Sequence, residues 1–311
     1  MKKEELYFDS RDGINKIHAV RYTPDSGEVH CVVQIIHGMS EYIERYEEFA
    51  RFLTEKGIVV TGDDHLGHGK SVPEGDTFGY FCEQDPATVV VRDVHRLKKM
   101  TQALYPNVPY VIVGHSMGSF ILRNYMCRYG TGISGAVIMG TGMQPAGLIG
   151  ISKALAAAQK VFCGSKHVSK FLDKAAFGSY NKRCEPVRTK FDWLSRNTEN
   201  VDRYIADPLC GFTFTVNGFQ TLFELISRIQ KSENLEKIPK ELPVFMVSGE
   251  DDPVGDYGVG VKKAFASLQE AGLENMQLKL YEKDRHEILN EDDRDVVMQD
   301  IYDWIKGTIL V

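Results

Sequence analysis

Ser116 is the residue of this chain whose surroundings most directly predict chemistry. It lies at the centre of Gly-His-Ser-Met-Gly, residues 114–118, after an apolar run at 109–113 and before a helical pattern at 119–126. A serine on a sharp turn between a strand and a helix has its hydroxyl lifted clear of the sheet. The glycines leave room for neighbouring backbone. The pattern therefore predicts a nucleophile, the alternative being a serine in an ordinary tight turn.

A serine nucleophile needs a base and an acid, which follow it in the order acid, then histidine, on such a framework. His286 is the one histidine beyond residue 167, and it comes just after an alternating apolar run at 276–281. Asp252 follows a buried-strand pattern at 242–249, and the proline after it favours an extended backbone. We therefore predict His286 as base and Asp252 as acid, with Asp251 as the alternative acid. Taken singly, these residues also fit a solvated turn and a surface histidine.

Acyl transfer develops negative charge on a carbonyl oxygen, which backbone N–H groups can stabilise. The N–H of Met117 is expected at a helix N-terminus beside Ser116. A second donor should come from the loop after an early strand. The apolar strand at 32–36 is followed by His37, Gly38 and Met39, so we predict the Met39 N–H as that donor. His37 is expected to be a packed, hydrogen-bonded residue below the site rather than a catalytic one.

Five stretches of the chain resemble the monoacylglycerol lipase and lysophospholipase branch of the α/β-hydrolases, which is also described as serine aminopeptidase S33-like. In chain order they are IHGMSE (36–41), DDHLGHGKS (63–71), GHSMG (114–118), SGEDDPV (248–254) and YEKDRH (281–286). The resemblance implies a mostly parallel sheet with helices on both faces and an inserted helical cap. It also implies a Ser116, Asp252 and His286 triad, with the N–H groups of Met39 and Met117 as oxyanion hole. Tyr42 departs from the family pattern, in which many members carry a second histidine.

Apolar runs and amphipathic segments alternate along the chain, and this alternation by itself predicts a mostly parallel sheet covered on both faces. The expected strands are an early hairpin at 6–8 and 17–22, then 32–36, 58–61, 109–113, 135–140, 242–249 and 276–281. The expected helices are 46–53, 90–104, 119–126 and 219–226. The fold class is therefore α/β.

The alternation stops between about residues 141 and 216, where helical segments dominate. We predict a helical cap at 143–216, inserted between two parts of one core at 1–142 and 217–311. An apolar stripe at helical spacing runs from Ile151 to Phe162. It either fixes the cap to the core or lines an acyl-chain pocket and touches lipid. The candidate substrate-binding residues are Leu155, Phe162, Phe212 and Phe214.

Composition narrows the class of protein further. The net charge of −6 and the lack of a basic run argue against nucleic-acid binding. The first residues show no apolar signal region, and no uninterrupted apolar stretch reaches about 20 residues, so we expect a cytoplasmic protein. Six scattered cysteines are expected as reduced thiols. No Cys/His spacing indicates a metal, and serine acyl chemistry needs no cofactor.

The sequence therefore predicts a serine hydrolase of carboxylic esters, acting on monoacylglycerol, lysophospholipid or similar acyl esters through an acyl-enzyme. The expected partner is a small acyl-ester or lipid substrate, with transient membrane-surface contact through the cap. An aminopeptidase or amidase is the alternative, which would need carboxylates in the cap to hold a substrate ammonium. A non-catalytic binding protein on the same scaffold is a further alternative, although such a protein should have lost a triad member. Oligomeric state is not predicted.

Overall fold

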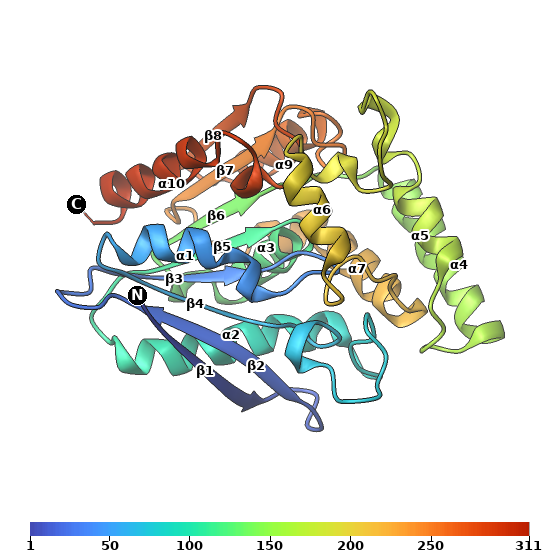
Figure 1. Ribbon diagram of the computed structural model, residues 1–311, viewed down its shortest axis with the longest axis horizontal. Helices are drawn as coiled ribbons and strands as arrows, with labels where there is room; N and C mark the ends of the chain where they lie inside the picture. The colour runs from blue at the N-terminus through green and yellow to red at the C-terminus, as the bar shows by residue number, and fades with distance from the viewer. Residues whose placement is uncertain (311) are drawn as a thin grey trace.

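A single eight-stranded sheet crosses the computed structural model, which describes residues 1–310 (Figure 1). The strands lie in the order β1-β2-β4-β3-β5-β6-β7-β8. Their bounds are β1 Lys2–Asp9, β2 Lys16–Thr23, β3 Cys31–Ile36, β4 Ile58–Asp63, β5 Tyr110–His115, β6 Gly135–Met139, β7 Val244–Gly249 and β8 Met276–Tyr281. From β4 to β8 every pairing is parallel, whereas β1 and β2 form an antiparallel hairpin that joins β4 at one edge. The predicted fold class is confirmed.

Helices cover both faces of the sheet, because alternate residues of the central strands point to opposite sides. One face packs against α1 (Glu47–Thr54) and α10 (Arg294–Thr308), and the other against α2 (Pro86–Leu104), α3 (Met117–Tyr129), α7 (Val216–Arg228) and α9 (Val259–Glu270). The short helix α8 (Ser232–Leu235) precedes β7. Strands β3 to β7 are buried on both faces, which explains their near-continuous apolar sequences.

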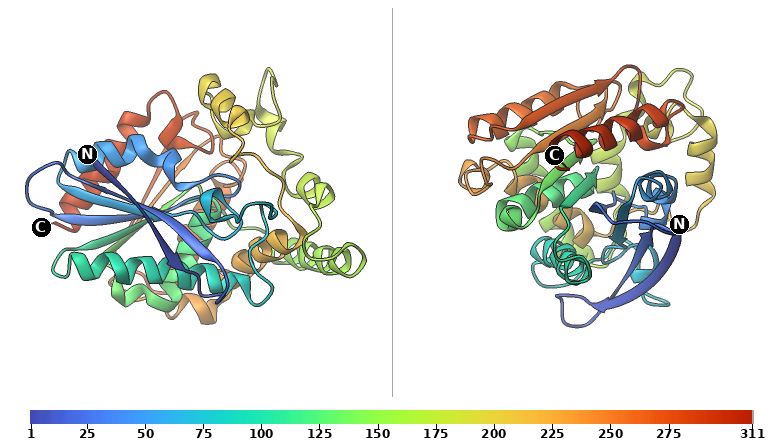
Figure 2. Two further views of the ribbon diagram at one scale, coloured as in Figure 1. Left: turned by 60° about the horizontal axis from the view of Figure 1, so that its bottom comes forward. Right: turned by 90° about the vertical axis from the view of Figure 1, so that its left-hand side faces the viewer.

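Between β6 and α7 the chain leaves the sheet and forms α4 (Ala146–Cys163), α5 (Lys170–Phe177) and α6 (Thr198–Ala206). Helices α4 and α5 stand at the end of the molecule opposite the two termini (Figure 1), and they project at that end in the left view of Figure 2 as well. Helix α4 packs along α7 and is otherwise largely exposed. Within the described residues it alone is long and apolar enough to cross a membrane, judged by length and composition only.

Asp93 of α2 is a buried carboxyl group beneath the turn that joins β1 to β2. Its Oδ2 accepts a hydrogen bond from Ser10 Oγ at 2.7 Å, and its Oδ1 accepts one from the Arg11 N–H at 2.6 Å. Burial raises the pKa of Asp93 to about 7, because removal from water disfavours the charged form. The hairpin is therefore attached to α2 through a group that holds its proton far above the usual aspartate range.

We expect this group to make the free energy of unfolding fall as the pH rises. The unfolded chain releases the proton near pH 3.9, so the folded state binds more protons up to about pH 7. Asp93→Asn, which cannot ionise, should remove roughly 1 to 3 kcal/mol of that loss. Denaturant unfolding at about pH 4.5 and about pH 8 measures it, with the exposed Asp303→Asn as control. An Asp93→Asn variant with the wild-type pH dependence would contradict the prediction.

Candidate active site

Ser116 lies at the turn between β5 and α3, with φ 54° and ψ −121°. A positive φ is unusual for a residue other than glycine and marks a strained backbone. The turn is possible because both flanking glycines lack a side chain. A Cβ on Gly114 would lie 2.5 Å from the carbonyl oxygen of Gly118, and a Cβ on Gly118 would overlap the carbonyl of Ile36. Local sequence thus accounts for the position of the serine hydroxyl above the sheet.

His286 and Asp252 lie side by side although 34 residues separate them in sequence. His286 Nδ1 and Asp252 Oδ2 are 3.0 Å apart, and both side chains are buried. Asp252 follows β7, and its other carboxylate oxygen accepts the Val254 N–H at 2.8 Å. Asp251, the alternative acid, is exposed. The structure therefore pairs His286 with Asp252 rather than with its neighbour.

The loop after β3 lies against Ser116, since a Cβ on Gly38 would be 3.1 Å from the Cβ of Ser116. Met39 and Met117 both border the cavity that contains Ser116. Within the part of the chain that the structure describes, neither of their backbone N–H groups donates a hydrogen bond to another protein group. Two backbone donors are thus free to face a ligand atom beside the serine, as an oxyanion hole requires.

A cavity of about 770 Å³ opens above Ser116 and His286 between the cap helices and the core. This is the size of pocket that encloses a small organic ligand. Its core wall includes Phe120 and Leu222, and its cap wall includes Leu155 and Phe212. The exposed surface of the lining is mostly apolar. The geometry therefore places a mostly apolar cavity next to the Ser116 side chain.

Two of the four predicted substrate-binding residues do not line this cavity. Leu155 and Phe212 do. Phe162, in the last turn of α4, is 86% exposed. Phe214 is fully buried beneath the cavity, where its ring packs edge-on against Phe81 and His68. The structure therefore contradicts the prediction that Phe162 and Phe214 line the substrate pocket.

Comparison with known proteins gives the family. The family model described as serine aminopeptidase, S33 matches residues 27–293. The chain belongs to this family. It is 28% identical to the monoglyceride lipase of Rattus norvegicus over 296 residues, covering 94% of this chain and 87% of the relative. It is 26% identical to the monoacylglycerol lipase of Mycolicibacterium smegmatis, covering 97% of each.

A solved structure supports the same assignment. The thermostable carboxyl esterase from Bacillus coagulans, crystallised in complex with glycerol, superposes with a TM-score of 0.93 at 31% identity, covering 100% of both chains. The protein is therefore a carboxylic ester hydrolase of the α/β-hydrolase fold, in the branch of the family that contains the monoacylglycerol lipases. The predicted family and enzyme class are confirmed.

In this S33-family protein, His37 is a packed residue behind the loop that carries Met39. Its Nε2 accepts the N–H of His65 at 3.0 Å, and its ring stacks on that of His65 at 4.0 Å between centroids. Burial lowers the pKa of His37 to about 4, so the ring is neutral at physiological pH. His37 therefore supports the loop that carries Met39 and lies outside the cavity.

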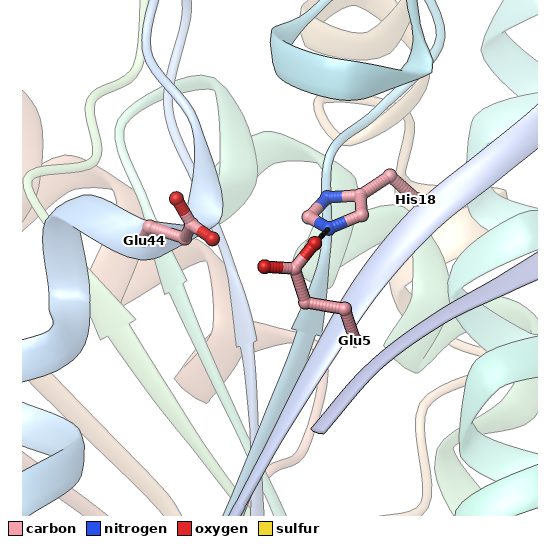
Figure 3. A group of neighbouring side chains, drawn as sticks. All are labelled: Glu5, His18 and Glu44. Atoms are coloured by element: carbon pink, nitrogen blue, oxygen red, sulfur yellow. Dashed lines mark hydrogen bonds and ion pairs between the residues drawn. The ribbon is translucent and has the colours of Figure 1, made fainter. Parts of the chain in front are cut away.

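One cluster has ligand types suited to a metal, but it fits an ion-pair network better. Glu5 of β1, His18 of β2 and Glu44 of the 3-10 turn Ile43–Tyr46 converge (Figure 3). Lys70 Nζ donates to Glu5 at 3.0 Å and to Glu44 at 3.1 Å, so an ammonium already neutralises these carboxylates. None of the three residues borders the cavity. The cluster is therefore separate from the ester-hydrolase site.

Several residues at or beside the site could not be predicted from the sequence pattern. Trp193 lies with its ring centroid 5.1 Å from that of His286, and it borders the cavity. It comes from a short 3-10 turn, Asp192–Leu194, which has no periodic pattern. A buried ion cluster lies beside the site and consists of Glu41, Arg45 and Glu287. From sequence alone, charged side chains such as these are expected at the surface, and only the tertiary structure shows that they pack together.

Proposed function

We propose that the protein hydrolyses acyl esters through a covalent acyl-enzyme formed on Ser116. The Ser116 hydroxyl attacks the ester carbonyl carbon while His286 accepts the hydroxyl proton. The negative carbonyl oxygen of the tetrahedral intermediate is stabilised by the N–H groups of Met39 and Met117. The intermediate then expels the alcohol, which receives the proton from His286, and water repeats the sequence to release the acid.

The observation that carries this proposal is the buried pair of His286 and Asp252, whose histidine borders the same cavity as Ser116. A carboxylate at Nδ1 holds that nitrogen as N–H, so Nε2 is left to accept the serine proton. The same carboxylate stabilises the imidazolium that forms when the proton arrives. The strained turn at Ser116 and the two free N–H groups supply the remaining parts of the mechanism.

For the substrate, we propose a neutral ester of a fatty acid with a small alcohol, with monoacylglycerol as the first candidate and lysophospholipid as the second. The apolar lining of the cavity suits an alkyl chain, and its volume suits a ligand with one such chain. The relatives named as monoglyceride lipases, and the esterase crystallised with glycerol, support a glycerol-like alcohol.

Aminopeptidase activity is disfavoured by the charges of the cap. An amino-acyl substrate needs carboxylates to hold its ammonium group. Among the described residues of the cap segment 143–216, Asp173 is the one carboxylate that borders the cavity, and Lys174 and Lys190 border it too. The cap wall therefore offers a substrate ammonium at least as much repulsion as attraction.

A fluorophosphonate probe and a substrate panel test the proposal together. The probe should label the protein stoichiometrically, and mass spectrometry should place the adduct on Ser116. The panel should vary the acyl chain and the alcohol of the ester and include an amino-acyl amide. Hydrolysis of the amide in preference to every ester would refute the proposed substrate class, and an adduct elsewhere would refute the nucleophile.

Leu155 should determine how strongly activity depends on acyl-chain length. Each buried CH₂ contributes about 0.8 kcal/mol, so two further carbons should raise kcat/KM up to roughly tenfold until the cavity is full. A charge at the cavity wall in Leu155→Asp should remove that dependence more than it lowers activity on an acetyl ester. Phe162→Asp is the matched control on the same helix, because Phe162 points to solvent. Equal chain-length profiles for the Leu155→Asp variant and wild type would exclude Leu155 from the acyl pocket.

A further inference from the structure

A buried ion cluster lies directly behind the active-site cavity. Arg45 Nη1 donates to Glu41 Oε2 at 2.6 Å and to Glu287 Oε1 at 2.8 Å, while Nη2 donates to Glu287 Oε2 at 2.8 Å. The three side chains are 11%, 4% and 3% exposed, respectively. Arg45 does not border the cavity, although both carboxylate residues do. One guanidinium thus joins two carboxylates that belong to different loops.

Glu41 connects Arg45 to the loop that carries Met39. Its Oε1 accepts the N–H of Gly38 at 2.5 Å and the hydroxyl of Tyr46 at 2.8 Å. Because Gly38 immediately precedes Met39, this bond fixes the backbone next to the N–H that we propose as an oxyanion donor. Any movement of the Glu41 carboxylate would therefore turn an N–H group of the proposed oxyanion hole.

Glu287 connects the same guanidinium to the loop that carries His286. Glu287 is the next residue after His286, and its N–H donates to the carbonyl of Leu194 at 2.7 Å. Its Oε2 also accepts from Asn200 Nδ2 of the cap helix α6 at 2.7 Å. The bidentate bond to Arg45 thus fixes the backbone beside the histidine and ties it to the cap.

The cap also contacts the loop after β3 that carries Met39, which we call the oxyanion loop. The Tyr204 ring of α6 lies under the Arg45 guanidinium at 4.9 Å, and its hydroxyl donates to the Ser40 carbonyl at 3.0 Å. The N–H of Gly211 donates to that same carbonyl at 3.0 Å. The oxyanion loop, the histidine loop and helix α6 therefore meet at Arg45.

We propose that Arg45 is a positioning residue for the hydrolytic reaction, holding the Met39 N–H and the His286 imidazole in one fixed arrangement around Ser116. The guanidinium suits this role because it is planar and donates in a rigid fork, so it fixes direction as well as charge. The inference rests on the proposed function, which assigns the roles of Met39 and His286. Arg45 acts through these groups and touches no substrate.

Steady-state kinetics of Arg45→Met and Arg45→Lys on one short-chain ester test the inference. Arg45→Met should lower kcat on the order of 10²-fold with little change in KM, because misplaced catalytic groups cost rate rather than binding. Arg45→Lys should give an intermediate loss, since an ammonium keeps the charge but not the fork. Arg51→Met is the matched control, because it breaks the exposed Arg51–Glu47 pair in α1 and should change neither constant.

The double variant Arg45→Met/Glu287→Gln separates positioning from charge neutralisation. It removes one buried charge of each sign, so its melting temperature should rise above that of Arg45→Met while kcat stays low. Recovery of kcat together with the melting temperature would overturn the inference, as would a folded Arg45→Met or Arg45→Lys variant with kcat within about twofold of wild type. If Arg45→Met does not fold, Arg45→Lys keeps the charge and carries the test. Ser116→Ala in the same assay distinguishes the two failures, because a variant that kept a tenth of wild-type activity would refute the proposed function itself.

Discussion

Ser116→Ala should lower kcat for ester hydrolysis on the order of 10⁴-fold or more, because the acyl-enzyme cannot form without the hydroxyl. His286→Ala should cost a similar factor, since the serine would then keep its proton. The double variant should lose little beyond either single variant, because the two residues act as a unit. Initial rates on a chromogenic ester, with enzyme concentrations high enough to resolve the residual activity, provide the measurement.

A serine outside the site gives the control for that experiment. Ser267→Ala removes a hydroxyl in α9 that donates to the Ala264 carbonyl of the same helix. It should retain wild-type kcat and full fluorophosphonate labelling. A Ser116→Ala enzyme that keeps a tenth of wild-type activity would show that another group performs the attack.

Asp252→Asn should have the second large effect, a fall in kcat on the order of 10⁴-fold at neutral pH. An amide at this position donates through its NH₂ group toward Nδ1, which favours the histidine tautomer with its proton on Nε2. That tautomer cannot accept the serine proton. Asp251→Asn is the matched comparison, because its side chain is exposed and one position away in sequence.

The comparison of these two variants decides whether residue 252 or residue 251 is the acid. We expect Asp251→Asn to retain most of the wild-type kcat, since its side chain is exposed and its backbone N–H donates to the Asp284 carbonyl at 2.9 Å, a bond that the substitution keeps. A larger loss for Asp251→Asn than for Asp252→Asn would move the acid to residue 251. Kinetics across pH, with melting temperatures recorded beside them, would separate a change in tautomer from a loss of folded protein.

The strands and the sharp turn at Ser116 could be predicted from sequence because their causes are local. Strands β3, β4, β5, β6 and β7 are continuous apolar runs, since each is buried on both faces. The glycines at 114 and 118 indicate that other backbone lies close to the turn at Ser116, and both are found within one five-residue segment. Asp252 and His286 were selected by chain order, and that order reflects how parallel strands bring their carboxyl ends to one edge of the sheet.

The lining of the cavity could not be predicted in the same way. Leu155 and Phe162 lie on one stripe of α4, seven residues apart, so periodicity gives them the same environment. The structure separates them because Leu155 borders the cavity at 41% exposure, whereas Phe162 is 86% exposed and does not border it. Helical spacing determines which face of a helix is apolar, whereas the packing of other elements determines which turns are buried.

The chain by itself therefore determined the fold class, the nucleophile turn and the order of the candidate triad, because each depends on short-range pattern or on strand sequence. Only the tertiary structure decided which side chains meet around Ser116. Arg45, Glu41 and Glu287 illustrate the reason, since their charges predict exposure and 242 residues separate Arg45 from Glu287. Buried ions are stable only when every partner is in place, and those partners come from loops that the fold alone brings together.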